Sequence, residues 1–95
     1  MFPEEKLDVI RSFLKEKFSN YSVRDYWDFD SEGQTFFLEG EDRRLTFSRN
    51  FLDDSSTSDI SMFLEREGQE LGRYLHREGI TRVIVTNQGI KLEKK

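Results

Sequence analysis

The chain has 95 residues and a formal net charge of −4 at pH 7, and it contains no cysteine. This length supports one domain, residues 1–95, and the missing cysteine excludes disulfides, thiolate catalysis and thiolate metal sites. The acidic balance argues against a nucleic-acid partner and against binding to an anionic membrane. Because the chain has neither a long apolar span nor the features of a signal peptide, we expect a cytoplasmic protein.

The first predicted element is an amphipathic helix that starts near Pro3 and ends near residues 19–20. Leu7, Ile10 and Leu14 recur at spacings of three and four, which places them on one face of a helix. Proline is well suited to the first helical turn, and the acidic residues beside it complement the helix dipole.

Three short runs follow in which apolar and polar residues alternate, and they predict a three-stranded antiparallel meander. The runs lie at 21–29, 35–39 and 43–48, separated by acidic turns at 30–33 and 39–42 whose glycines are expected to adopt positive φ. A period of two directs alternate side chains to opposite faces of the sheet. The face expected to join the core carries Tyr21, Val23, Trp27, Phe29, Phe36, Leu38, Leu45 and Phe47.

A second helix is predicted from residue 59 to about residue 78. The polar stretch 53–59 precedes it and is rich in side chains that cap helix N-termini. Gly68 falls within the apolar stripe of this helix. Since glycine is unfavourable in a helix interior, its presence predicts a close approach of the helix backbone to the sheet.

The last predicted element is a strand at 80–86. Apolar residues occur there at both parities, which is typical of a strand covered on both faces. Residues 87–89 form a turn signal, and 90–92 are expected to add a short hairpin partner. The sequence therefore predicts an α+β fold of order α-β-β-β-α-β, with an antiparallel three-stranded meander, a C-terminal strand and two helices packed on the sheet.

One acidic turn has the spacing of a cation-binding loop. Asp28, Asp30, Glu32, Gly33 and Glu39 occupy the positions that supply oxygen ligands and the sharp turn in a calcium-binding EF-hand. An EF-hand is flanked by helices, whereas the flanking runs here alternate as strands do. We therefore interpret the segment as a solvated hairpin turn, and a weak divalent-cation site in it as the alternative.

The predicted order of elements is similar to the core order of the PD-(D/E)XK nucleases. That family positions a metal ion and a water with carboxylates and a lysine on adjacent strands. This resemblance implies a divalent-metal-dependent enzyme that uses the acidic turns 28–32 and 39–42. The nearest triplet, Glu41-Asp42-Arg43, lies in a turn and has arginine in place of the lysine. Arginine cannot readily accept a proton, which argues against an active nuclease. Since the sequence offers no other set of catalytic groups, we expect no catalysis and no cofactor.

The second face of the predicted sheet has the composition of a protein interface. It carries Arg24, Tyr26, Thr35, Phe37, Arg44 and Thr46. If both helices pack on the first face, these residues stay exposed, and aromatic and arginine side chains are enriched in protein interfaces. Our hypothesis is a protein–protein interaction module, acting as adaptor, inhibitor or homodimer. The residues expected to contact the partner are Arg24, Tyr26, Phe37 and Arg44.

Overall fold

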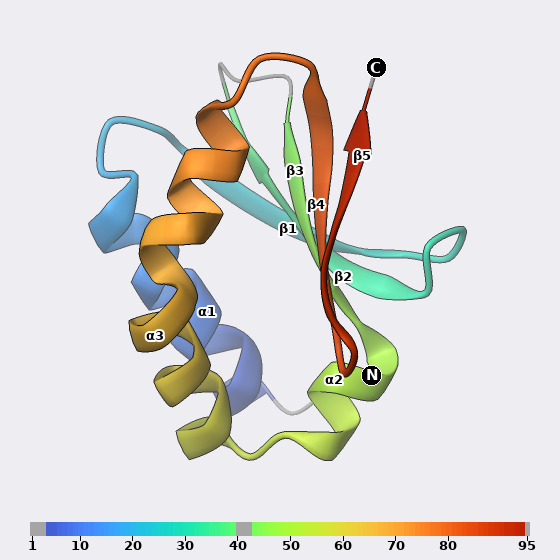
Figure 1. Ribbon diagram of the computed structural model, residues 1–95. Coiled ribbons are helices and arrows are strands. Elements are labelled where there is room, and N and C mark those ends of the chain that lie inside the picture. The colour runs from blue at the N-terminus through green and yellow to red at the C-terminus, as the bar shows by residue number, and fades with distance from the viewer. Residues whose placement is uncertain (1–3, 40–42, 95) are drawn as a thin grey trace.

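The computed structural model describes residues 4–39 and 43–94, which form three helices and a five-stranded sheet (Figure 1). In chain order the elements are α1 (Glu4–Lys17), β1 (Val23–Asp28), β2 (Gly33–Leu38), β3 (Arg44–Ser48), α2 (Arg49–Asp54), α3 (Thr57–His76), β4 (Ile80–Thr86) and β5 (Gly89–Lys94). The α+β fold, the meander and the C-terminal hairpin are as the sequence predicts. Residues 40–42 of the predicted second turn lie outside the described residues.

The five strands form one sheet in the order β1-β2-β3-β4-β5. All neighbours are antiparallel except β3 and β4, which are parallel. Parallel neighbours need a crossover connection, and α2 and α3 provide it. Helices α1 and α3 pack against each other on one face of the sheet, the helix face (Figure 1). No helix of the described chain covers the opposite face, which we call the open face.

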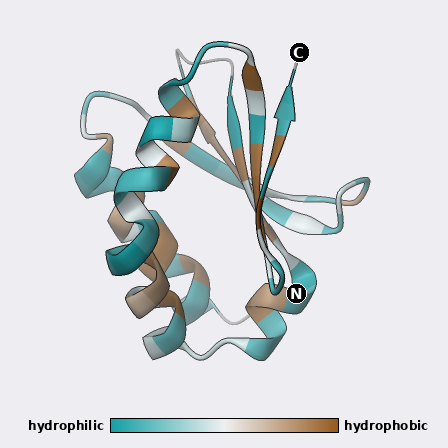
Figure 2. Cartoon of the chain, viewed as in Figure 1, coloured by the Kyte–Doolittle hydropathy of each residue, from teal (hydrophilic) through white to brown (hydrophobic). Residues whose placement is uncertain are grey.

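The hydrophobic core lies between the sheet and the helices. The apolar sides of α1 and α3 turn toward the sheet and their polar sides turn away (Figure 2). The strands supply most of the predicted core face. The buried apolar side chains of the strands are Phe36, Leu38, Leu45, Phe47, Ile80, Val83 and Val85, and those of the two long helices are Leu7, Ile10, Leu14, Ile60, Leu64, Leu71 and Leu75.

The prediction of the core face is wrong for one residue. Phe29 lies in the turn after β1, and 82 % of its surface is exposed. Phe29 still lies on the helix side of the sheet, beside Trp27, but it follows the end of β1 and lies outside the packed core. Within β1 the helix-facing position between Val23 and Trp27 belongs to Asp25, a charged residue on the core side of the sheet.

Helix α2 is the element that the sequence does not predict. It has six residues, which is too short for an apolar period to emerge. Ser48 caps it by accepting a hydrogen bond from the backbone N–H of Phe51. Phe51 and Leu52 are buried, so this short helix closes one end of the core.

Helix α3 begins two residues before its predicted start. Ser56 is the N-cap and forms a reciprocal capping box with Asp59. Gly68 is buried, as its place in the stripe suggests, but its close neighbour is α1 and not the sheet. A Cβ atom at this position would lie 2.8 Å from Cζ of Phe13. The prediction of an approach to the sheet is therefore wrong, because this part of α3 packs against the other helix.

Glycine is required at position 33 because there is no space for a Cβ atom, and not because the backbone adopts a positive φ there. The positive φ in the first turn belongs to Glu32, at 51°. A Cβ atom at Gly33 would lie 2.6 Å from Cγ2 of Thr46 and 2.7 Å from the carbonyl oxygen of Phe47. A contact with backbone cannot be relieved by a side-chain rotation.

We expect Gly33→Ala to lower the free energy of unfolding by at least about 1 kcal/mol, because overpacking a closed site forces the backbone to shift. Urea denaturation measures the effect. Gly72→Ala is the matched control, since a Cβ atom there makes only an ordinary 3.6 Å contact with Lys17. In the interior of α3 this control should be neutral or stabilising. Equal destabilisation by both substitutions would contradict the steric explanation.

Candidate functional site

The open face brings together the four residues predicted to contact a partner. Arg24 of β1 is the cross-strand partner of Phe37 of β2, and Phe37 is in turn the partner of Arg44 of β3. Tyr26 lies two residues further along β1, on the same face. We call these four residues the arginine–aromatic surface.

The side chains of this surface are partly ordered by contacts with one another and with a neighbour. The guanidinium carbon of Arg44 lies 5.8 Å from the ring centroid of Phe37, which is a cation–π distance. Arg24 forms an ion pair with Glu39. Tyr26 is 42 % exposed, and Phe37 is half-buried beneath Arg44. The result is an accessible pair of aromatic rings flanked by two arginines.

The rest of the open face is less accessible than the sequence suggests. Thr35 and Thr46 are fully buried, and their hydroxyl oxygens are 2.8 Å apart in a hydrogen bond. The twisted sheet turns β1 and β2 across the other strands (Figure 1). As a result Arg82 of β4 reaches Asp28 of β1 at 3.2 Å, and only 15 % of each side chain is exposed. The expectation that both threonines are exposed is therefore wrong.

Two of the four candidate cation ligands take part in ion pairs, and the other two, Asp30 and Glu32, are exposed in the turn. Asp28 is paired with Arg82, and Glu39 is paired with Arg24. Within residues 4–39 and 43–94, no three histidine or carboxylate side chains are grouped so that they could hold a metal ion. The triplet of the nuclease resemblance, 41–43, lies outside the described residues except for Arg43, whose guanidinium donates to the carbonyl oxygen of Leu75.

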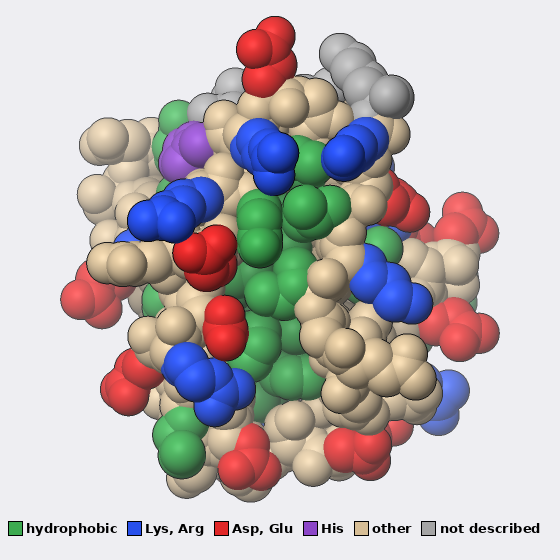
Figure 3. Space-filling view, viewed as in Figure 1, with side chains coloured by type: hydrophobic (Ala, Val, Ile, Leu, Met, Phe, Trp, Pro, Cys, Tyr) green, Lys and Arg blue, Asp and Glu red, His purple; other side chains and the backbone are tan. Residues whose placement is uncertain are grey.

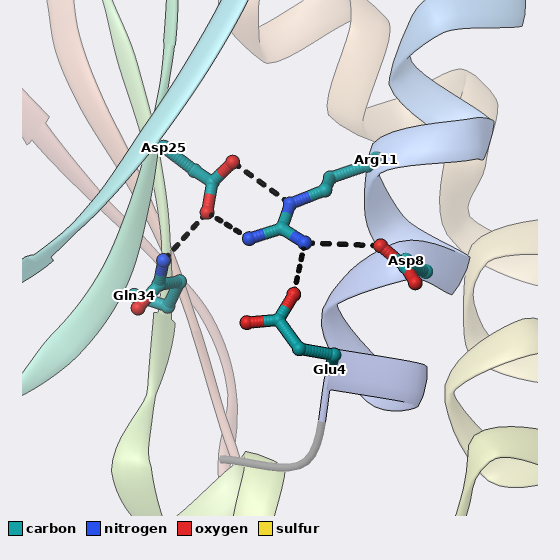
Figure 4. Close-up of polar contacts among 5 residues, drawn as sticks. All are labelled: Glu4, Asp8, Arg11, Asp25 and Gln34. Atoms are coloured by element: carbon teal, nitrogen blue, oxygen red, sulfur yellow. Dashed lines mark hydrogen bonds and ion pairs between the residues drawn. The ribbon is translucent and has the colours of Figure 1, made fainter. Parts of the chain in front are cut away.

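A polar network on the helix face ties α1 to the sheet (Figure 4). Arg11 donates to both carboxylate oxygens of Asp25, from Nε at 2.9 Å and from Nη2 at 2.8 Å. Gln34 also donates to Asp25, at 2.7 Å. The remaining guanidinium nitrogen contacts Glu4 at 2.6 Å and Asp8 at 3.0 Å. The bidentate pair of Arg11 and Asp25 therefore joins α1 to β1, and Gln34 extends the network to β2.

The network shifts the pKa values of Arg11 and Asp25. The hydrogen bonds from Arg11 lower the pKa of the Asp25 carboxyl, and Gln34 adds to this, while burial opposes it. The hydrogen bond to Asp25 is likewise the main reason that the pKa of Arg11 is raised. Both groups stay charged near neutral pH, so Asp25 acts as a structural anchor. In the sequence, the sign of this anchor is a charged residue at a strand position whose side chain is expected to face the core.

A groove of about 640 Å³ opens beside this network. Its lining residues are Glu4, Leu7, Arg11, Asp25, Trp27, Phe29, Gln34, Arg49 and Asp53. The rings of Trp27 and Phe29 meet edge to face, with centroids 6.4 Å apart. Arg49 and Asp53 pair with each other across 3.6 Å. Because the charges of both signs are already paired, the lining does not favour a ligand of either charge.

Comparisons with family models, with curated proteins and with solved structures find no match for this chain. Its surfaces are therefore interpreted from their own chemistry. None of the described helices combines the length and the apolar character that crossing a membrane requires.

Proposed function

We propose that this protein is a cytoplasmic protein-interaction module, an adaptor or inhibitor without catalysis, and that it binds another protein through the arginine–aromatic surface. The observation that supports this best is the row formed by Arg24, Phe37 and Arg44 across three strands, on a face that no described helix covers.

The chemistry of the surface suits a protein partner. Tyrosine and arginine are the side chains that most often dominate binding energy in interfaces. Arg44 is already stacked on Phe37, so less side-chain entropy is lost when the partner binds. Arg24 is already paired with Glu39. The guanidinium group of Arg44, beside the aromatic rings, therefore fits a partner segment that presents an apolar side chain next to a carboxylate.

The test is an affinity pull-down from the native cell lysate with the tagged protein and two variants. Tyr26→Ser/Arg44→Glu alters two exposed residues of the arginine–aromatic surface. Phe29→Ser/Arg49→Glu makes the same kinds of change at exposed residues of the groove on the helix face. We expect a stoichiometric partner that is retained by the wild type and the second variant and lost by the first.

Each variant must first give the circular dichroism spectrum and the unfolding midpoint of the wild type. A partner that binds the Tyr26→Ser/Arg44→Glu variant as well as the wild type contradicts the proposed surface. Loss of the partner only in the Phe29→Ser/Arg49→Glu variant would assign binding to the groove instead.

A further inference from the structure

The outer strand β5 leaves apolar side chains at the edge of the molecule. It is the last strand in the sheet order, and α3 packs along its neighbour β4. Ile90 and Leu92 pair with Val85 and Val83, so they lie on the helix face. Both are only half-buried, whereas their partners on β4 are fully buried. Figure 3 shows a band of hydrophobic side chains exposed between α3 and the C-terminal strands.

The two edges of the sheet differ in how they are protected. At the edge formed by β1, the helix-facing Asp25 is bound to Arg11, so this edge carries an inward-pointing charge and is held by α1. Such charges are a common way to prevent pairing between sheet edges. The centre of β5 presents Ile90 and Leu92 on the helix face, and no helix residue is bound to it as Arg11 is bound to Asp25 within the described part of the chain. The exposed charges of β5, at Lys91, Glu93 and Lys94, oppose pairing with a strand that does not match them. Of the two edges, β5 is therefore the one suited to pair, and only with a strand of matching charge.

Along β5 the backbone N–H and C=O groups point alternately toward β4 and away from it, and those in the middle of the strand that point away are available to another strand. Thr86 and Gly89 close a two-residue hairpin, and the closing pair of such a hairpin is hydrogen-bonded. The next residue, Ile90, therefore directs its N–H and C=O away from β4, and so does Leu92 two residues later. These are the groups that an added strand would engage.

The exposed charges of β5 are complementary to those of a second, antiparallel copy of β5. Lys91 and Glu93 are exposed on the open face, on either side of Leu92. Glu93 also lies 3.7 Å from Nε of Arg82 on β4, but more than half of its side chain is exposed, so it can still face a lysine on an added strand. When two copies of β5 pair antiparallel about a two-fold axis at Leu92, each Lys91 lies opposite Glu93 of the second copy. An axis at Lys91 or at Glu93 would instead place like charges opposite each other, which is destabilising. An axis at Ile90 would place Lys91 opposite Gly89 and form no ion pair. Among these registers the axis at Leu92 is therefore the one that pairs each lysine with a carboxylate, and it brings the two Leu92 side chains together.

We propose that the protein forms a two-fold symmetric dimer in which β5 strands of two copies pair antiparallel around Leu92, joining the two sheets into one. The partner is a second copy of this chain, and the contact is isologous. This dimer uses a different edge from the arginine–aromatic surface, which lies on β1, β2 and β3. Each dimer would therefore present two such surfaces and could bind a bivalent partner with avidity.

The first test measures mass by sedimentation equilibrium for the wild type, Lys91→Glu and Glu93→Lys. The wild type should be a dimer. Each variant places like charges opposite each other twice, so its dissociation constant should rise at least about tenfold. An equimolar mixture of the two variants should form a heterodimer, because the carboxylates of one chain then face the ammonium groups of the other. A wild type that stays monomeric to about 100 µM, or a mixture that does not associate, overturns the proposal.

The second test locates the axis with single cysteines in a chain that has none of its own. In the proposed register the Cα atoms of the two residues at 92 are about 5.5 Å apart, within disulfide range. Leu92→Cys should therefore form a disulfide-linked dimer under mild oxidation. Ile90→Cys is the matched control on the same strand and face, and it should cross-link much more slowly. Faster cross-linking at 90 than at 92 contradicts the register. These outcomes do not depend on the binding surface of the proposed function.

Discussion

Phe47→Ala is expected to lower the free energy of unfolding by about 3–5 kcal/mol. Phe47 is fully buried, and its ring centroid lies 5.8 Å from that of Phe36 and 5.8 Å from that of Phe51. Phe51 in turn lies 5.2 Å from Phe63. This row of rings joins β2, β3, α2 and α3, so the cavity left at Phe47 removes contacts from both layers of the fold.

The expected loss is large relative to the stability of a small domain, which is about 5–15 kcal/mol in total. Urea denaturation followed by circular dichroism measures it. Phe29→Ala is the matched control because it deletes the same ring from a residue that is 82 % exposed, and it should cost less than about 1 kcal/mol. If the two substitutions had equal effects, Phe47 would not be part of a packed core in solution.

The main outline of the fold can be predicted from the sequence because it depends on local periodicity. Leu45 and Phe47 alternate with polar residues, and Leu7, Ile10 and Leu14 recur at helical spacing. These patterns determine which side of each element is buried. The row Arg24–Phe37–Arg44 was predictable for the same reason, since parity places all three residues on the second face and the hairpins bring them side by side.

Features that depend on contacts between distant segments could not be predicted. The twist of the sheet brings Arg82 to Asp28, 54 positions apart, and covers Thr35 and Thr46 on a face that no described helix covers. The parallel pairing of β3 with β4 depends on the route of the chain through α2 and α3. Likewise, the charge at Asp25 interrupts an apolar alternation, but nothing in the local sequence identifies Arg11 as its partner.

We expect Asp25→Asn to lower the free energy of unfolding at pH 7 by about 2–3 kcal/mol. This second large effect follows from the pairing of Asp25 with Arg11. The carboxylate of Asp25 accepts three hydrogen bonds, two from Arg11 and one from Gln34. An amide group offers one oxygen and adds two donors of its own. The variant therefore leaves donors of the network facing each other, at a residue whose side chain is only 14 % exposed. Asp30→Asn, at an exposed residue outside the network, should have little effect.

The same network predicts how stability depends on pH. The pKa of Asp25 in the folded protein lies below its ordinary value of 3.8, because Arg11 and Gln34 donate to the charged form. Its contribution is therefore complete above pH 3.8 and is lost as the pH falls through that value toward the folded-state pKa. We expect the difference in unfolding free energy between the wild type and Asp25→Asn to be constant near neutral pH and to shrink in acid.

Other carboxyls with lowered pKa values, such as Asp59, are present in both proteins and cancel in the difference. Denaturant titrations from pH 7 to about pH 2 measure this difference, and two curves that stay parallel over the whole range would show that Asp25 has no ionised partner in solution.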